Sequence, residues 1–160
     1  MSVKMKIQGL MIDPVSQMPI VILKDSSEDQ VLPIWVGVFE ANAIATQLEK
    51  IVSPRPMTHD MLRSTIEQLG GRIEKIVITD LREATFYATL HLDRGGEKVE
   101  VDSRPSDAMA LALRCEAPIF VEETVLNKSS GPGDPDSMEP DRLRRWLETV
   151  DPKELGQYEM

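Results

Sequence analysis

A change in the spacing of apolar residues constrains the fold of this chain more than any other feature. Val3 and Met5 alternate with polar neighbours, as in a half-buried strand. Apolar runs at 19–23 and 31–36 are typical of two further strands, and Pro33 favours an edge or irregular position for the last one. The N-terminal part therefore predicts an antiparallel meander.

Beyond this meander the apolar residues recur every three or four positions. We expect an amphipathic helix from Val38 to Val52 that ends before Pro54. Thr58 is a natural N-cap for a second helix, with Asp60 in its first turn. The apolar face of this second helix is expected to hold Leu62, Ile66 and Leu69.

Strand patterns then return at 72–80, 85–93 and 98–101. A third helix is expected over 108–113, and a short strand over 118–121. These elements predict an α+β fold with a mixed, mainly antiparallel sheet and three principal helices, plus a short helical C-terminal appendage.

Composition divides the 160 residues into one domain and a tail. Residues 1–128 carry the expected strands and helices, and their number is usual for a single domain. Residues 129–140 are rich in Gly, Pro, Ser and Asp, as in a flexible linker. Residues 141–160 contain a short amphipathic helical pattern with Trp146 on its apolar side. We therefore expect a core that folds without the tail.

The charge of the chain limits its functions. A formal net charge of -9 and 4% aromatic residues argue against a protein that coats nucleic acid or stacks bases over a broad surface. Nucleic acid is therefore expected as a substrate at a local site rather than as a tightly held ligand. Lys4, Lys6 and Asp13 interrupt the N-terminal segment, so we expect no signal peptide, no membrane contact and a cytoplasmic location.

Signatures of several enzyme classes are missing from the sequence. It has no dinucleotide fingerprint, phosphate loop, CxxC pair, HExxH or G-x-S-x-G elbow. Its two histidines, His59 and His91, exclude a histidine-rich zinc site, and His91 suits a structural place in a strand. The lone Cys115 ends an apolar run and is expected to be a buried structural thiol. Candidate chemistry therefore depends on carboxylates, arginines and one histidine.

Two of the expected helix starts carry such residues. Glu40 directly follows a strand, where it either compensates the helix dipole or takes part in a site. Thr58 and Asp60 suit the start of the second helix, but His59 does not, because a cation is not favoured at that end. A structural and a functional role for His59 remain equally open.

The third segment, from Asp102 to Asp107, joins a strand to a helix and contains two carboxylates, two hydroxyls and an arginine. Ser103 is expected as the N-cap and Pro105 in the first turn, which leaves Arg104 unexplained. A guanidinium at a helix start suits a phosphate or another anion, whereas Asp102 and Asp107 could instead bind a metal ion.

Together these segments resemble the motifs of the bifunctional nuclease domain family: IWVGVFEANAIA at 34–45, RPMTHDML at 55–62 and DSRPSDAMALALR at 102–114. The resemblance covers roughly residues 3–128, and the segment 146–152 also looks like the ending of bacterial members. It implies a mixed α/β fold, assembly into a homodimer or larger homo-oligomer, and cleavage of both DNA and RNA, the activity reported for some plant members.

On this basis we expect a nuclease that hydrolyses phosphodiester bonds with Mg²⁺ or Mn²⁺. The catalytic candidates are His59, Asp60, Arg104 and Asp107, the metal candidates Asp60, Asp102 and Asp107, and the binding candidates Glu40, Ser103 and Ser106. The alternative is a non-catalytic module that binds an anion, a ligand or a partner, and the acidic charge favours it. The two are separated by whether His59, Asp60 and residues 102–107 lie within one metal-coordination sphere, and scattered positions would favour the module.

Overall fold

The computed structural model describes residues 1–27 and 29–129. In chain order its elements are β1 (Ser2–Ile12), β2 (Pro19–Asp25), β3 (Val31–Trp35), α1 (Val38–Leu48), α2 (Thr58–Gln68), β4 (Gly71–Arg82), β5 (Thr85–Arg94), β6 (Glu97–Ser103), α3 (Pro105–Cys115), β7 (Ile119–Glu122) and α4 (Glu123–Ser129). The strands form one seven-stranded sheet, so the expected α+β class is confirmed. The helix expected within 141–160 lies outside the described residues. Of the helices in the described part, none is long and apolar enough to cross a lipid bilayer.

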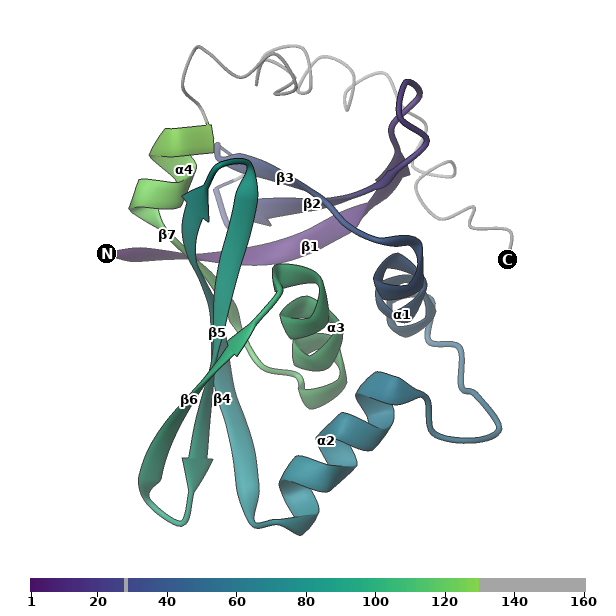
Figure 1. The fold of residues 1–160 in the computed structure, drawn as a ribbon, viewed down its shortest axis with the longest axis vertical. Helices are drawn as coiled ribbons and strands as arrows, with labels where there is room; N and C mark the ends of the chain where they lie inside the picture. The colour runs from purple at the N-terminus through teal and green to yellow at the C-terminus, as the bar shows by residue number, and fades with distance from the viewer. Residues whose placement is uncertain (28, 130–160) are drawn as a thin grey trace.

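Two antiparallel meanders make up most of the sheet, whose strand order is β3-β2-β1-β7-β4-β5-β6. β7 joins them, because it pairs antiparallel with β1 and parallel with β4. In Figure 1 the first meander, β1 to β3, runs across the view, while β4 to β6 run along its long axis. The sheet is therefore strongly twisted, as sheets of right-handed strands are. β3 lies at one edge, which confirms the position that Pro33 predicted.

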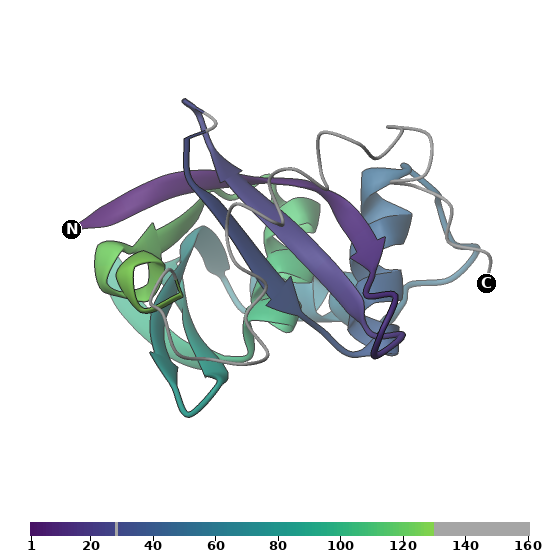
Figure 2. The ribbon, with the colours of Figure 1, turned by 90° about the horizontal axis from the view of Figure 1, so that it is seen from above.

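Helix α3 lies at the centre of the molecule and contacts α1, α2, β4 and β5. Its buried apolar residues are Ala108, Met109, Ala110, Leu111 and Ala112. Three of these are alanines, and their small side chains let neighbouring elements approach closely. Figure 2 shows that α1 and α4 lie at opposite ends of the first meander. Helix α3 therefore packs against α1 and α2.

Two helix boundaries differ from the expectation. α1 ends at Leu48 rather than near Val52, because Lys50 adopts the left-handed conformation with φ of 56° and Val52 is exposed. Thr58 is the first residue of α2 and not its N-cap. The N-cap is Met57, whose backbone N–H donates to Oδ2 of Asp60 at 2.9 Å. The carboxylate of Asp60 therefore satisfies the N–H of the N-cap residue, as the third helical residue of a capping box does, and no threonine hydroxyl caps this helix.

Helix α2 lies at the edge of the molecule, and its expected apolar face is largely exposed. Leu62 and Leu69 are open to solvent, and only Ile66 packs partly against the core. The one buried residue of this helix is His59. The part of α2 that the fold covers is thus its first turn, where it meets α3.

Candidate active site at the start of helix α3

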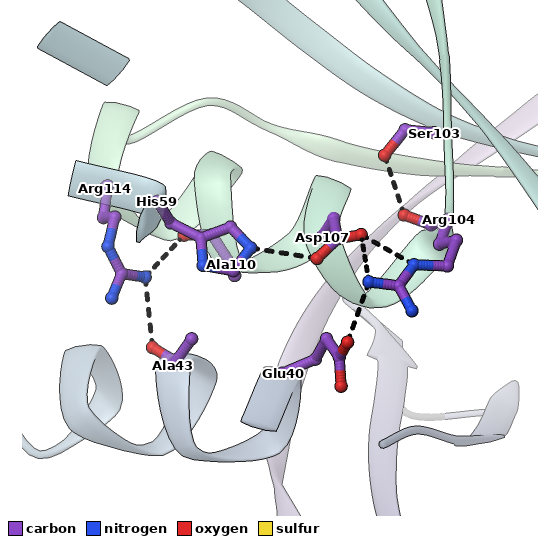
Figure 3. A network of polar contacts seen from close by, with 8 residues as sticks. All are labelled: Glu40, Ala43, His59, Ser103, Arg104, Asp107, Ala110 and Arg114. Carbon is purple, nitrogen blue, oxygen red and sulfur yellow. Dashed lines mark hydrogen bonds and ion pairs between the residues drawn. The ribbon is translucent and has the colours of Figure 1, made fainter. Parts of the chain in front are cut away.

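The first turns of α1, α2 and α3 meet in one network of polar contacts (Figure 3). Glu40 comes from α1, His59 from α2, and Arg104 and Asp107 from the start of α3. Asp107 lies between His59 and Arg104, and Arg104 lies between Asp107 and Glu40. The structure therefore brings together residues from all three segments that stood out in the sequence.

Arg104 is the centre of this network. Its Nε donates to Oδ2 of Asp107 at 2.8 Å, and its Nη2 donates to Oε1 of Glu40 at 2.7 Å. The hydrogen bond to Asp107, with a smaller effect from Glu40, raises the pKa of the guanidinium. Its side chain nevertheless remains 67% exposed. Two carboxylates thus hold a cation in place while leaving it open to solvent.

His59 reaches the network through Asp107. Its Nε2 lies 3.0 Å from Oδ1 of Asp107, and its side chain is only 11% exposed. One oxygen of Asp107 therefore contacts His59, and the other contacts both Nε and Nη2 of Arg104. Because its Nε2 is engaged by Asp107 and its ring is covered, His59 is placed to orient Asp107.

A second network joins the same three helices further along α3. Nε of Arg114 donates to Oδ1 of Asp60 at 2.7 Å, and its Nη1 donates to the carbonyls of Ala43 and Ala110 at 3.0 and 2.8 Å. The pKa of Asp60 is lowered mainly by the N–H of Met57 and then by Arg114. Asp60, a catalytic candidate, therefore belongs to this second network and not to the one around Arg104.

Arg114 is the residue that sequence reasoning missed. It lies at the end of an otherwise apolar helix, and its side chain is only 4% exposed. A signal was present in the sequence, because Arg114 stands four positions after Ala110 and thus on the same buried face of the helix. An arginine on such a face needs buried acceptors, which the residue type alone does not identify.

The N-cap of α3 is not the serine expected from the sequence. Arg104, and not Ser103, is the N-cap of α3, with φ of -69° and ψ of 144°. Ser103 remains in β6, and its hydroxyl donates to the carbonyl of Arg104 at 2.8 Å. Pro105 is the first helical residue, as expected. Because the strand continues to Ser103, the helix starts one residue later than its hydroxyl suggested.

Ser106 is buried, with 7% of its surface exposed. Among residues 1–27 and 29–129, its hydroxyl has no hydrogen-bond partner. Buried hydroxyls are usually satisfied, so this one is available to a water molecule or a ligand group. It lies in the first turn of α3, between Arg104 and Asp107 in the chain.

The expected metal ligands do not form one set. Asp102 lies on β6 opposite Thr89 and takes no part in either network. The carboxylates of Asp60 and Asp107 each receive N–H donors on both oxygens. In the described part of the chain, no three His, Cys, Asp or Glu side chains are grouped as a metal ion requires. These residues therefore do not fit a divalent ion in the arrangement expected.

The remaining candidates for reactive groups lie apart from the site. His91 is on β5, where its Nδ1 lies 3.6 Å from Glu100 on β6. Cys115 is partly buried at the end of α3, and burial raises the pKa of its thiol. A raised pKa keeps a thiol protonated and unreactive, in line with a structural role.

Comparison with known proteins agrees with the motifs. The family model described as the bifunctional nuclease domain matches residues 21–133. An uncharacterized protein of Mycobacterium tuberculosis is 42% identical over 123 residues, which are 77% of this chain and 73% of that protein.

Plant relatives match more distantly. Bifunctional nuclease 1 of Oryza sativa subsp. japonica is 29% identical over 109 residues, covering 66% of this chain and 33% of the rice protein. Bifunctional nuclease 2 of Arabidopsis thaliana is 26% identical over 107 residues, covering 65% and 32%. The chain thus spans about a third of these plant proteins. From the family model and the mycobacterial relative together, the chain belongs to the bifunctional nuclease domain family.

Proposed function

We propose that this protein hydrolyses phosphodiester bonds in DNA and RNA at the site formed by Glu40, His59, Arg104 and Asp107. The observation that carries the proposal is the guanidinium of Arg104, which two carboxylates hold at the start of α3 while it stays exposed. Membership of the family and the names of the plant relatives support it. The proposal assigns a separate role to each of the four side chains.

Arg104 is the phosphate contact. Its Nε and Nη2 are engaged by Asp107 and Glu40, whereas Nη1 has no hydrogen-bond partner in the described part of the chain. A guanidinium can donate through this free edge to the non-bridging oxygens of a phosphodiester. Charge that develops on those oxygens in the transition state would then be stabilised by a group that is already in place.

Glu40 is the candidate general base. Its Oε1 accepts from Arg104, while Oε2 has no donor among the residues that the structure describes. That oxygen can take a proton from water as the water attacks phosphorus and the bond to the leaving oxygen breaks. The leaving oxygen takes a proton from solvent and Glu40 releases its proton to solvent, so the carboxylate is restored and no further reagent is needed.

Asp107 and His59 are positioning residues in this proposal. Asp107 holds Nε of Arg104, and the His59 ring holds the other oxygen of Asp107. Because the His59 ring is buried, it restricts the orientation of the carboxylate. Loss of Asp107 should therefore free Arg104 as well as remove a negative charge from the site.

We propose that any divalent ion in the reaction is bound to the nucleic acid and not held by a set of protein ligands. Mg²⁺ and Mn²⁺ neutralise phosphates in the counterion atmosphere of DNA and RNA. The rate of cleavage, measured with a chelator, with added Mg²⁺ and with added Mn²⁺, tests whether the reaction needs such an ion. No step assigned above to a side chain depends on it.

The test is cleavage of single-stranded DNA and RNA by purified protein. Arg104→Ala and Asp107→Asn should each lower turnover by about a hundredfold, as loss of a transition-state charge contact does in other enzymes. Arg94→Ala is a matched control, because Arg94 is 60% exposed and pairs with Glu97 at the far end of β5. It should cleave as the wild type does.

Two results would contradict the nuclease proposal. One is wild-type protein that cleaves no more than a preparation from cells lacking it. The other is cleavage that survives both site substitutions. Either result would favour the alternative, a non-catalytic module that binds a ligand or partner. The carboxylates beside Arg104 and the net charge of -9 support that alternative, because both repel a polyanion.

We also propose that the chain acts as a cytoplasmic homodimer or larger homo-oligomer. Phe39, Val52, Met61 and Leu69 are exposed apolar side chains on or next to α1 and α2, where a second copy could cover them. The mass measured by light scattering at micromolar protein should exceed that of the 18.0 kDa chain. A monomeric mass would contradict this part of the proposal.

A further inference from the structure

The side chain of Glu40 folds back over Gly37, the N-cap of α1. An ideal Cβ added at Gly37 would overlap with Oε2 of Glu40 and lie 3.3 Å from its Cδ. The backbone of Gly37 has φ of -70° and ψ of 158°, an extended conformation open to any residue. What glycine provides here is therefore space for the Glu40 side chain and not backbone freedom.

The backbone around Gly37 is held on both sides. The N–H of Val36 donates to the carbonyl of Pro19 at 3.0 Å, and the carbonyl of Gly37 accepts from the N–H of Ala41 at 2.9 Å. Ala41 is fully buried against the core. A side chain at position 37 would therefore displace the flexible side chain of Glu40 before it moved the backbone.

From this geometry we propose that Gly37 is a positioning residue of the site. The space that it leaves lets Glu40 fold back at the start of α1, with Oε2 beside Gly37. Oε1 of the same carboxylate contacts Arg104 (Figure 3). Gly37 thus acts on Arg104 through Glu40, without contacting it. The consequence for catalysis rests on the nuclease proposal, whereas the consequence for Arg104 does not.

The contacts from Gly37 to Glu40 and from Glu40 to Arg104 can be tested with four proteins. These are the wild type, Gly37→Ala, Glu40→Ala and the double variant. Side-chain NMR of arginine measures how fast each guanidinium rotates and exchanges its protons. Loss of the bond to Glu40 should speed up these processes at Arg104 by about fivefold, as expected for an exposed ion pair. Arg114 is an internal control, because it makes no contact with Glu40 and should stay unchanged.

The double variant separates positioning from a general structural effect. If Gly37 acts only through Glu40, then Gly37→Ala should change Arg104 as Glu40→Ala does. It should then add nothing when the carboxylate is already absent. Wild-type rates at Arg104 in Gly37→Ala would overturn the proposal, as would unchanged rates in Glu40→Ala or additive effects in the double variant.

A cleavage assay on the same four proteins keeps the two proposals apart. An active wild type should lose similar activity in both single variants and no more in the double variant. Equal losses that add in the double variant would overturn the role of Gly37. An inactive wild type whose Arg104 responds as expected would overturn the nuclease proposal and leave the role of Gly37 supported.

Discussion

The two ends of helix α3 each carry an arginine, and their surroundings differ sharply. At the start of the helix, the side chain of Arg104 is exposed and paired with Glu40 and Asp107. In the last turn, the side chain of Arg114 is buried, with Asp60 and two backbone carbonyls as acceptors. One residue type therefore serves two purposes at the two ends of a single helix.

The difference shows which end holds the structure and which end is free to bind. Arg114 joins α1, α2 and α3, and its guanidinium faces protein groups. Arg104 also joins two helices, but most of its surface faces water. A buried charge that loses a partner is costly, whereas an exposed ion pair contributes little to stability. Substitution of Arg114 should therefore mainly lower stability, whereas substitution of Arg104 should mainly lower activity.

Replacement of Arg114 by Met should have the largest effect. The change leaves the Asp60 carboxylate and the carbonyl of Ala43 without their buried donor. Asp60 is 37% exposed and keeps the N–H of Met57, so the main cost is that of acceptors left without a donor, and we expect the free energy of unfolding to fall by about 1–3 kcal/mol. Urea denaturation followed by circular dichroism measures it.

The control for this prediction is Arg63→Met on α2. Arg63 is exposed and pairs with Glu67 one turn away, so its replacement should cost less than about 1 kcal/mol. If Arg114→Met cost no more than Arg63→Met, the contrast between the two ends of α3 would have no energetic basis.

Replacement of Asp60 by Asn should have the next largest effect. It removes the charge opposite Arg114 but keeps an oxygen that can accept, and we expect a loss of about 1–2 kcal/mol at neutral pH. The pKa of Asp60 in the folded protein lies below its ordinary value of 3.8, so its stabilisation is complete above about pH 4 and is lost as the pH falls. The difference between wild type and variant should therefore shrink on acidification, and a constant difference down to pH 2 would contradict this linkage.

Replacement of Arg104 by Ala should have a smaller effect on stability. Its two ion pairs are exposed, so we expect the free energy of unfolding to fall by less than about 1 kcal/mol, even though cleavage should fall about a hundredfold. Denaturation and activity measured on one preparation separate the two effects. A loss as large as that of Arg114→Met would mean that Arg104 is a structural residue, and a fall in activity could then not be assigned to catalysis.

Replacement of Ser106 by Ala should have the smallest effect on stability. Its buried hydroxyl has no partner in the described part of the chain, so its removal should change the free energy of unfolding by about zero or raise it slightly. The melting temperature measures this. A clear loss of stability would show that the hydroxyl binds a structural water. Unchanged stability with weaker cleavage would show that it contacts the substrate or a water beside it.

Much of the fold could be predicted from the sequence, because alternation and helical repeats are local signals. β5 covers Thr85–Arg94, within one residue of the expected range. The end of α1 was placed too far along, since Val52 continues the apolar repeat although the chain has already turned at Lys50. α4 was not predicted, because seven residues are too few to establish a helical repeat.

The sequence by itself determined that carboxylates, an arginine and a histidine stand at three helix starts, because capping and dipole effects depend on neighbours along the chain. Only the tertiary structure decided which of them meet. Glu40 and Arg104 are 64 positions apart and hydrogen-bonded, whereas Asp102, two positions from Arg104, remains outside the network. The place of Arg114 on the apolar face of α3 is a local signal, but its acceptors from α1 and α2 depend on how the helices pack, and no local pattern identifies them.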